Sequence, residues 1–146
     1  MKSIQNKQLI GIMGIFLFLL MGTIQLHGQS YDQSLLINKI WVCKIPGKTY
    51  YMTNRYTDKE EISNLFVDGV KDAVKIKSFY YLSDEVVDKF QLNLVGKSKS
   101  GKYIVALRKP KIGDERLELY EILELTDTTL KTKHLRSGTI LEYTAE

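Results

Sequence analysis

The chain has little of what usually cross-links or interrupts a small domain. It contains one cysteine, Cys43, so no internal disulfide can form, and it contains only two prolines. Cys43 alternates with Trp41 and Ile45 in "WVCKI", which favours a small buried hydrophobic residue over a reactive thiol. The sequence has no repeat, low-complexity segment or Gly-rich linker. The domain must therefore be stabilised by the packing of its own core.

Residues typical of catalytic and metal centres are also scarce. The sequence has two histidines and no H-E-x-x-H, no G-x-S-x-G and no paired Cys or His spacing, whereas a zinc site needs three or four such ligands. His134 in "TLKTKHLR" is typical of a solvated strand end. Carboxylates cluster in predicted turns, where solvation accounts for them: Asp58, Glu60, Glu61, Asp114 and Glu115. The sequence leaves open whether two carboxylates converge at one end of the fold. We nevertheless expect no enzymatic activity, no metal site and no cofactor.

The N-terminal segment predicts export. Lys2 and Lys7 precede an uncharged run of 16 residues, Leu9 to Ile24, and a bilayer-spanning helix needs about 20. A basic start, a short apolar run and small residues at its end are typical of a secretory signal peptide. We predict a signal peptide over residues 1–30, cleaved after Gly28 or Ser30, and one domain over 31–146. The protein is then periplasmic, envelope-associated or extracellular, and the membrane is a partner only if the peptide stays uncleaved as an anchor.

The charge of the mature chain argues against a polyanionic partner. Removal of Lys2 and Lys7 lowers the formal net charge from +4 to +2. The basic tracts "KSKSGK" and "RKPK" fall in predicted turns and lack the interleaved aromatic residues of a stacking platform. We therefore expect no nucleic acid partner.

One stretch has the spacing of a phosphate-binding loop. Gly96 to Lys102 reads G-K-S-K-S-G-K, but the following residue is Tyr103 rather than the Ser or Thr that holds magnesium. The continuation "YIVAL" is β-branched and alternating, whereas such a loop must run into a helix. The stretch predicts a solvated hairpin turn and no bound nucleotide.

Period-two alternation predicts strands along most of the chain. "KFQLNLVG" places Phe90, Leu92 and Leu94 on one face, "KYIVALRK" separates Tyr103, Val105 and Leu107 from Ile104 and Ala106, and "RLELYEILEL" groups Leu117, Leu119, Leu123 and Leu125. Hairpin loops are predicted at "KSKSG", "LTDTT" and "RSGT". Half-polar faces and close turns favour an all-β, antiparallel domain.

Asp58 to Gly69 is compatible with two structures. Asp58 and Glu61 could cap a short helix that Gly69 ends, or the same residues could form a strand that runs into an Asp-Gly turn. We prefer the strand slightly.

Several stretches resemble one family: "FYYLSD", "VGKSKSGKYIVAL", "YEILELTDTTLKTK" and "LEYTA" are similar to the lipocalin-like domains of secreted Bacteroidetes-type proteins. "LINKIW" is similar to their opening strand, with Asn38 where glycine is usual. The resemblance implies an antiparallel up-and-down barrel of about eight strands, and it implies that part of "SDEVVDKFQLNLVGK" is loop. The interior of such a barrel admits its own side chains or one small apolar ligand.

Two functions follow from this fold. The first is a binding module for a small hydrophobic molecule in or at the mouth of the barrel, and the second is a filled barrel that acts in the cell envelope through a protein partner. Aromatic residues are the candidates for the lining, although core packing is the commoner role of any one of them. The candidate lining residues are Trp41, Phe79, Tyr81, Phe90, Tyr103 and Tyr120.

Overall fold

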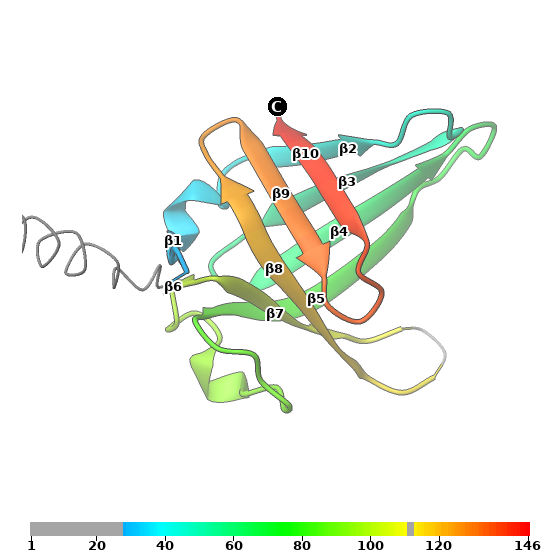
Figure 1. The fold of residues 1–146 in the computed structure, drawn as a ribbon. Coiled ribbons are helices and arrows are strands. Elements are labelled where there is room, and N and C mark those ends of the chain that lie inside the picture. Colours follow the sequence, from blue (N-terminus) through cyan, green and yellow to red (C-terminus); the bar gives the residue numbers. More distant parts are fainter. Residues whose placement is uncertain (1–27, 111–112) are drawn as a thin grey trace, which may run out of the picture.

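Eight antiparallel strands close into a barrel in the computed structural model, which describes residues 28–110 and 113–146 (Figure 1). Consecutive barrel strands are neighbours, and β10 pairs with β2 to complete the ring. The predicted all-β, up-and-down barrel of about eight strands is confirmed. The barrel strands are β2 (Ile40–Lys44), β3 (Tyr50–Tyr56), β4 (Glu60–Val67), β5 (Val74–Ser83), β7 (Tyr103–Arg108), β8 (Arg116–Leu125), β9 (Thr129–His134) and β10 (Ile140–Ala145).

The N-terminal prediction lies mostly outside the described residues. Of the predicted signal peptide, residues 1–30, only the last three are described. Within the described part of the chain, no helix has the length and apolar character required to cross a membrane.

Side chains on alternate positions of each strand form the core inside the barrel. Strands β2, β5, β7, β8, β9 and β10 all contribute, and the buried cluster includes Trp41, Cys43, Tyr80, Leu82, Ile104, Ala106, Ile122, Leu130 and Tyr143. Cys43 is a buried free thiol, as its alternation with Trp41 predicts. The grouping predicted for 103–107 is also confirmed, because Ile104 and Ala106 face the core together.

A short N-terminal segment closes one end of the barrel. Strand β1 (Tyr31–Asp32) leads into the 3-10 helix η1 (Gln33–Leu35), and the Asp32 carboxylate caps that helix by accepting from Ser34 N. Leu36 follows fully buried, and its carbonyl accepts a hydrogen bond from Trp41 Nε1 at 2.9 Å. Buried Gln33 donates from Nε2 to the Tyr80 hydroxyl at 2.7 Å. This end of the barrel is therefore filled with side chains.

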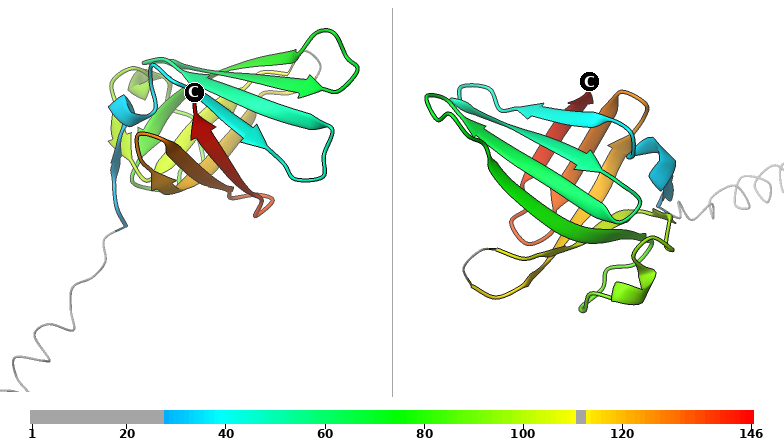
Figure 2. Two further views of the ribbon diagram at one scale, coloured as in Figure 1. Left: turned by 90° about the horizontal axis from the view of Figure 1, so that it is seen from above. Right: turned by 180° about the vertical axis from the view of Figure 1, so that it is seen from behind.

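The prediction of a strand over 89–96 was wrong. Strand β5 pairs directly with β7, so the chain from 84 to 99 runs outside the barrel and contains only the 3-10 helix η2 (Leu92–Leu94) (Figure 2). The predicted "KSKSG" hairpin is absent as well, because β6 (Ser100–Gly101) pairs with β1 instead. The loop implied by the family resemblance agrees with this part of the structure.

The preferred strand over 58–69 is confirmed, as are the hairpin loops at "LTDTT" and "RSGT". Strand β8 is also confirmed, but a bulge between Ile122 and Glu124 breaks its predicted apolar face. As a result Leu125 lies in the core, whereas Leu123 is exposed on the outside.

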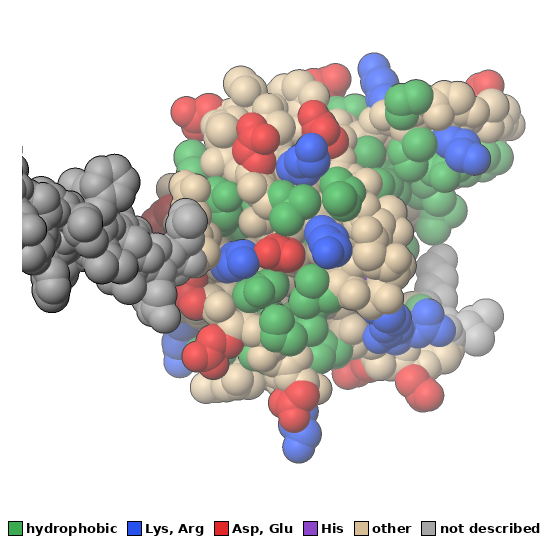
Figure 3. Space-filling view, viewed as in Figure 1, with side chains coloured by type: hydrophobic (Ala, Val, Ile, Leu, Met, Phe, Trp, Pro, Cys, Tyr) green, Lys and Arg blue, Asp and Glu red, His purple; other side chains and the backbone are tan. Residues whose placement is uncertain are grey.

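Basic and acidic side chains are interspersed with apolar ones on the outer face that carries β8, β9 and β10 (Figure 3). Lys131 on β9 pairs with Glu142 on β10 at 3.6 Å. This mixed surface is typical of a solvated sheet face.

Candidate functional site

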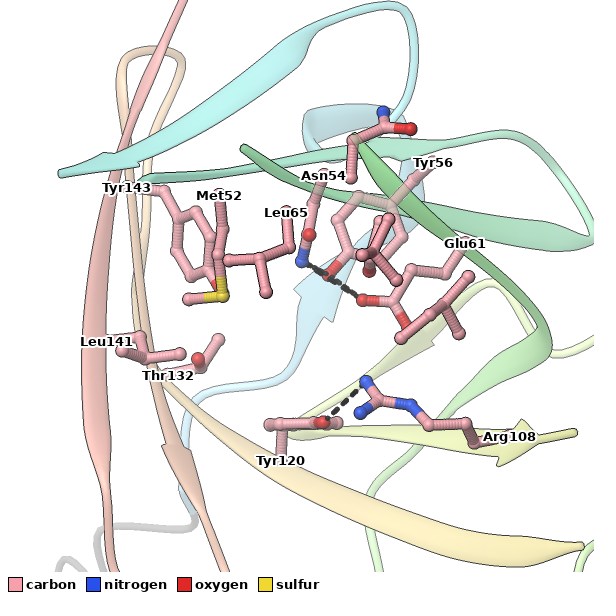
Figure 4. Close-up of a pocket in the computed structure, with 14 residues that line it drawn as sticks. Met52, Asn54, Tyr56, Glu61, Leu65, Arg108, Tyr120, Thr132, Leu141 and Tyr143 are labelled. Atoms are coloured by element: carbon pink, nitrogen blue, oxygen red, sulfur yellow. Dashed lines mark hydrogen bonds between the residues drawn. The ribbon is translucent and has the colours of Figure 1, made fainter. Parts of the chain in front are cut away.

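A cavity of about 270 Å3 lies inside the barrel (Figure 4). Its walls come from β3, β4, β5, β7, β8, β9 and β10, on the side of the core away from η1. One part of the lining is apolar: Met52, Leu65, Val74, Ile76 and Leu141. The other part is polar: Asn54, Tyr56, Glu61, Ser63, Asn64, Arg108, Tyr120, Thr132 and Tyr143.

Glu61 is the buried acid of this cavity, with 4% of its surface exposed. The register of β3 and β4 places it directly opposite Tyr56, and Asn54 points to the same side of β3. Its Oε1 atom accepts from Asn54 Nδ2 at 3.0 Å and from the Tyr56 hydroxyl at 3.1 Å. Its other oxygen, Oε2, is buried and has no hydrogen-bond partner among the described residues. The carboxylate is thus held by one oxygen, while the other lies buried in the cavity wall without a partner.

The electrostatics of Glu61 reflect its burial. Burial raises the pKa of Glu61 above its usual range, and the positive charge of Arg108 and the neighbouring hydroxyls of Tyr56 and Ser63 offset part of that rise. Burial also raises the pKa of Tyr56 well above its ordinary value, with Glu61 as a further cause. The Tyr56 hydroxyl therefore remains a proton donor to Glu61 at neutral pH.

Arg108 supplies the positive charge. It is the last residue of β7 and follows Ile104 and Ala106 at period two, so its side chain turns into the barrel. Arg108 Nη2 donates to the Tyr120 hydroxyl at 3.3 Å, while Nε is buried and unpaired within the described structure. Figure 4 shows the guanidinium pointing toward Tyr120, with the Glu61 carboxylate above it in the same cavity. Among the described residues the two groups do not form an ion pair.

A second polar pair lies beside Tyr120. His134 Nε2 and Glu118 Oε2 are 2.7 Å apart, and the rings of His134 and Tyr120 lie 5.1 Å apart between centroids. His134 ends β9, as the sequence predicts, but its side chain is mostly buried rather than solvated, because it pairs with the buried Glu118. Burial together with Glu61 raises the pKa of Tyr120 to about 12, although Arg108 acts in the opposite direction.

Of the six aromatic residues predicted to line the barrel, the structure places Tyr120 in the cavity wall. Trp41 also faces inward, but it lies fully buried in the core. Tyr81 is on the outer face of β5, where Phe90 of the external segment packs against it with ring centroids 5.2 Å apart. Phe79 and Tyr103 are also on the outside, the first with 38% of its surface exposed and the second beside Lys102. The structure therefore does not bring the six together.

The polar half of the cavity was not predicted. Glu61 was assigned to a solvated turn, and the structure corrects this because β4 already includes Glu61 and turns it inward. Arg108 was assigned to a basic turn tract. Alternation places Glu61 on one face with Ser63 and Leu65, and Arg108 on one face with Ile104 and Ala106, but it does not say which face of β4 is inside.

The arrangement offers hydrogen bonds and opposite charges rather than a metal centre. In the described part of the chain, no group of three His, Cys, Asp or Glu side chains is placed to hold a metal ion. Glu61 Oε2 can accept a hydrogen bond and Arg108 Nε can donate one, both from buried positions. The cavity is thus suited to a small molecule with an apolar body and one polar group.

The chain was compared with protein-family models, curated proteins and solved structures, and none of the three comparisons gave a match. The lipocalin-like family therefore stays a prediction, and the function has to be argued from the cavity itself.

Proposed function

We propose that this chain is an exported, lipocalin-like protein that binds a small, largely hydrophobic molecule inside its barrel. The observation that carries the proposal is the pair of unpaired buried atoms at the cavity, Glu61 Oε2 and Arg108 Nε. Buried polar atoms in native proteins nearly always have partners, and an unpaired one costs about 1–3 kcal/mol. A ligand that bonded to both would recover this cost.

The size and lining of the cavity support a small ligand. Its volume of about 270 Å3 is close to the lower end of ligand pockets, roughly 300 Å3. Met52, Leu65 and Leu141 offer apolar contacts to most of a ligand, and the polar groups stand on the opposite wall. This combination of an apolar wall with a few polar groups is typical of small-molecule sites.

The staggered strands offer a route into the cavity. The pairing of β5 with β7 begins at Ser78, opposite Arg108, so the described part of β7 leaves residues 74–77 of β5 uncovered on that side. Val74 and Ile76 line both the cavity and a groove on the surface that continues to Pro110. A ligand would enter here, at the end of the barrel away from η1.

The alternative is a filled barrel that acts through a protein partner in the envelope. One exposed feature favours it, because Tyr51 and Phe66 stack on the outer surface of β3 and β4 with ring centroids 4.7 Å apart. A barrel that only served as a scaffold would not need unpaired charged atoms inside it, so we prefer ligand binding.

Native mass spectrometry of the gently purified protein tests the proposal. We expect a bound small molecule on the wild-type protein and none on Leu141→Trp, whose larger side chain fills the cavity. Leu123→Trp is the matched control, since Leu123 lies exposed on the outer face and the change should leave the ligand bound. Repeated absence of any adduct from the wild-type protein, or an equal adduct on Leu141→Trp, would favour the filled barrel.

A further inference from the structure

We infer that the ligand carries a neutral head in which a hydrogen-bond donor and an acceptor lie side by side, as in a primary amide or a lactam. The inference rests on the proposed function, because it assigns the chemistry of a ligand in that cavity. It is carried by two atoms of residues in the cavity wall, the acceptor Glu61 Oε2 and the donor Arg108 Nε, which are both buried and unpaired in the described structure.

The acceptor is fixed in place by the strand register. Asn54 Nδ2 can only donate, and it holds Glu61 Oε1 at 3.0 Å together with the Tyr56 hydroxyl at 3.1 Å. These two donors set the orientation of the carboxylate, so Oε2 points into the cavity rather than toward β3. A ligand N–H group is the natural partner for this oxygen.

The donor is fixed by Tyr120. Arg108 Nη2 is bonded to the Tyr120 hydroxyl at 3.3 Å, which orients the planar guanidinium and leaves Nε for another acceptor. A carbonyl oxygen of the ligand would satisfy Nε without adding a charge.

Charged heads fit this pair less well. A ligand carboxylate would place a negative oxygen against Glu61 Oε2, and a ligand ammonium would place a positive charge against Arg108. A neutral amide presents its N–H to Glu61 and its carbonyl to Arg108, so both buried groups gain a partner of the correct kind. A ligand that leaves one of these buried groups unpaired, or places a like charge against it, binds much less tightly than one that pairs with both.

Three probes with the same six-carbon body separate the alternatives: hexanamide, hexanoate and hexylamine. At a pH above the folded-state pKa of Glu61, where Oε2 can only accept, we expect NMR titrations of the purified protein to show that hexanamide binds at least about tenfold more tightly than either charged probe. In Glu61→Gln, Asn54 should hold the new side-chain oxygen and turn its NH2 group into the cavity. The acceptor becomes a donor, so hexanoate should then bind more tightly than hexanamide.

Two further variants complete the test. Glu118→Gln makes the same change of charge at a buried carboxylate that pairs with His134 and is not in the cavity wall, so the preference for hexanamide should persist. Arg108→Met removes the donor and the positive charge, and it should abolish the discrimination against hexylamine. It also tests the inference independently should Glu61→Gln not fold.

Equal or tighter binding of hexanoate or hexylamine by the wild-type protein would overturn the inference and leave the proposed function standing. So would an unchanged order of affinities in Glu61→Gln. Failure of all three probes to bind the wild-type protein would overturn the inference, and the proposed function would fall with it if native mass spectrometry also showed no adduct.

Discussion

Replacement of Glu61 by Gln should change how the stability of the barrel depends on pH. Glu61 is 4% exposed, and its carboxylate is held by Asn54 and Tyr56 through a single oxygen. Gln is nearly isosteric with the protonated acid and retains an oxygen for those two donors. The substitution therefore removes the ionisation of this site with little change in packing.

The sign of the effect follows from burial. Burial raises the folded-state pKa of Glu61 above its ordinary value of 4.5, and Arg108 reverses only part of this rise. Below pH 4.5 the carboxyl is protonated in both states, so wild type and variant should have similar stability. Above that pH the unfolded chain releases its proton first, and the free energy of unfolding of the wild-type protein falls relative to that of Glu61→Gln as the pH rises toward the folded-state pKa.

The magnitude is that of one proton. When the folded state keeps one proton that the unfolded state has released, the free energy of unfolding changes with a slope that approaches about 1.4 kcal/mol per pH unit. Over one pH unit the free energy of unfolding of the variant should thus rise relative to that of the wild-type protein by an amount that is easily measured, since a domain of this size has a total stability of roughly 5–15 kcal/mol.

Urea denaturation between pH 4 and pH 7, followed by fluorescence, measures this slope. The chain has one tryptophan, Trp41, and it is fully buried, so its emission reports unfolding of the core. Glu85→Gln, at an exposed loop position, is the control and should follow the wild-type profile. A wild-type protein that instead becomes more stable than Glu61→Gln as the pH rises would refute the reasoning, because it would mean that Arg108 outweighs burial.

Substitutions at three further positions test the closed end of the barrel and the turn before β2. Gly101→Ala adds a methyl group that overlaps the backbone of Ser83, so thermal denaturation should show a loss of about 1–3 kcal/mol, and unchanged stability would mean that the β1–β6 ladder shifts freely. Asn38 has φ = 63°, so Asn38→Gly should be nearly neutral while Asn38→Ala loses about 0.5–1 kcal/mol in urea denaturation. Trp41→Phe removes the donor to the Leu36 carbonyl and should cost about 1–3 kcal/mol by circular dichroism, and a neutral result would show that this bond does not stabilise the closed end.

The strands themselves were largely predictable from the sequence. Alternation and turn residues located β7, β8 and β10, because each has at least one face whose apolar residues recur at period two. The same signal failed at 89–96, where Phe90, Leu92 and Leu94 alternate without a strand. Pairing is a property of the whole sheet, and β5 and β7 already satisfy each other, so Leu92 is left 66% exposed on the external segment.

The candidate site was harder to predict because a strand pattern defines two faces without saying which one is inside. In β8 the leucines at 117 and 119 lie outside, while Glu118 is buried and Tyr120 faces the cavity. In β4 the same inversion turns Glu61 inward beside Leu65. A shift of one residue exchanges the two faces completely, and only the partner strands fix the choice.

The exchange of apolar and polar residues between the two faces of these strands is informative about function. A barrel whose outer face were uniformly polar would keep its apolar residues for the interior, and its lining could be read from the sequence. Here β8 has leucines on its outer face and Glu118 and Tyr120 on its inner face. Strand β7 ends with Arg108, whose side chain points inward. Charged groups are expensive to bury unless they have partners, so their retention inside a small barrel requires a reason beyond folding. A ligand that supplies the missing hydrogen bonds to Glu61 and Arg108 is such a reason, and it is the one that the probe titrations examine directly.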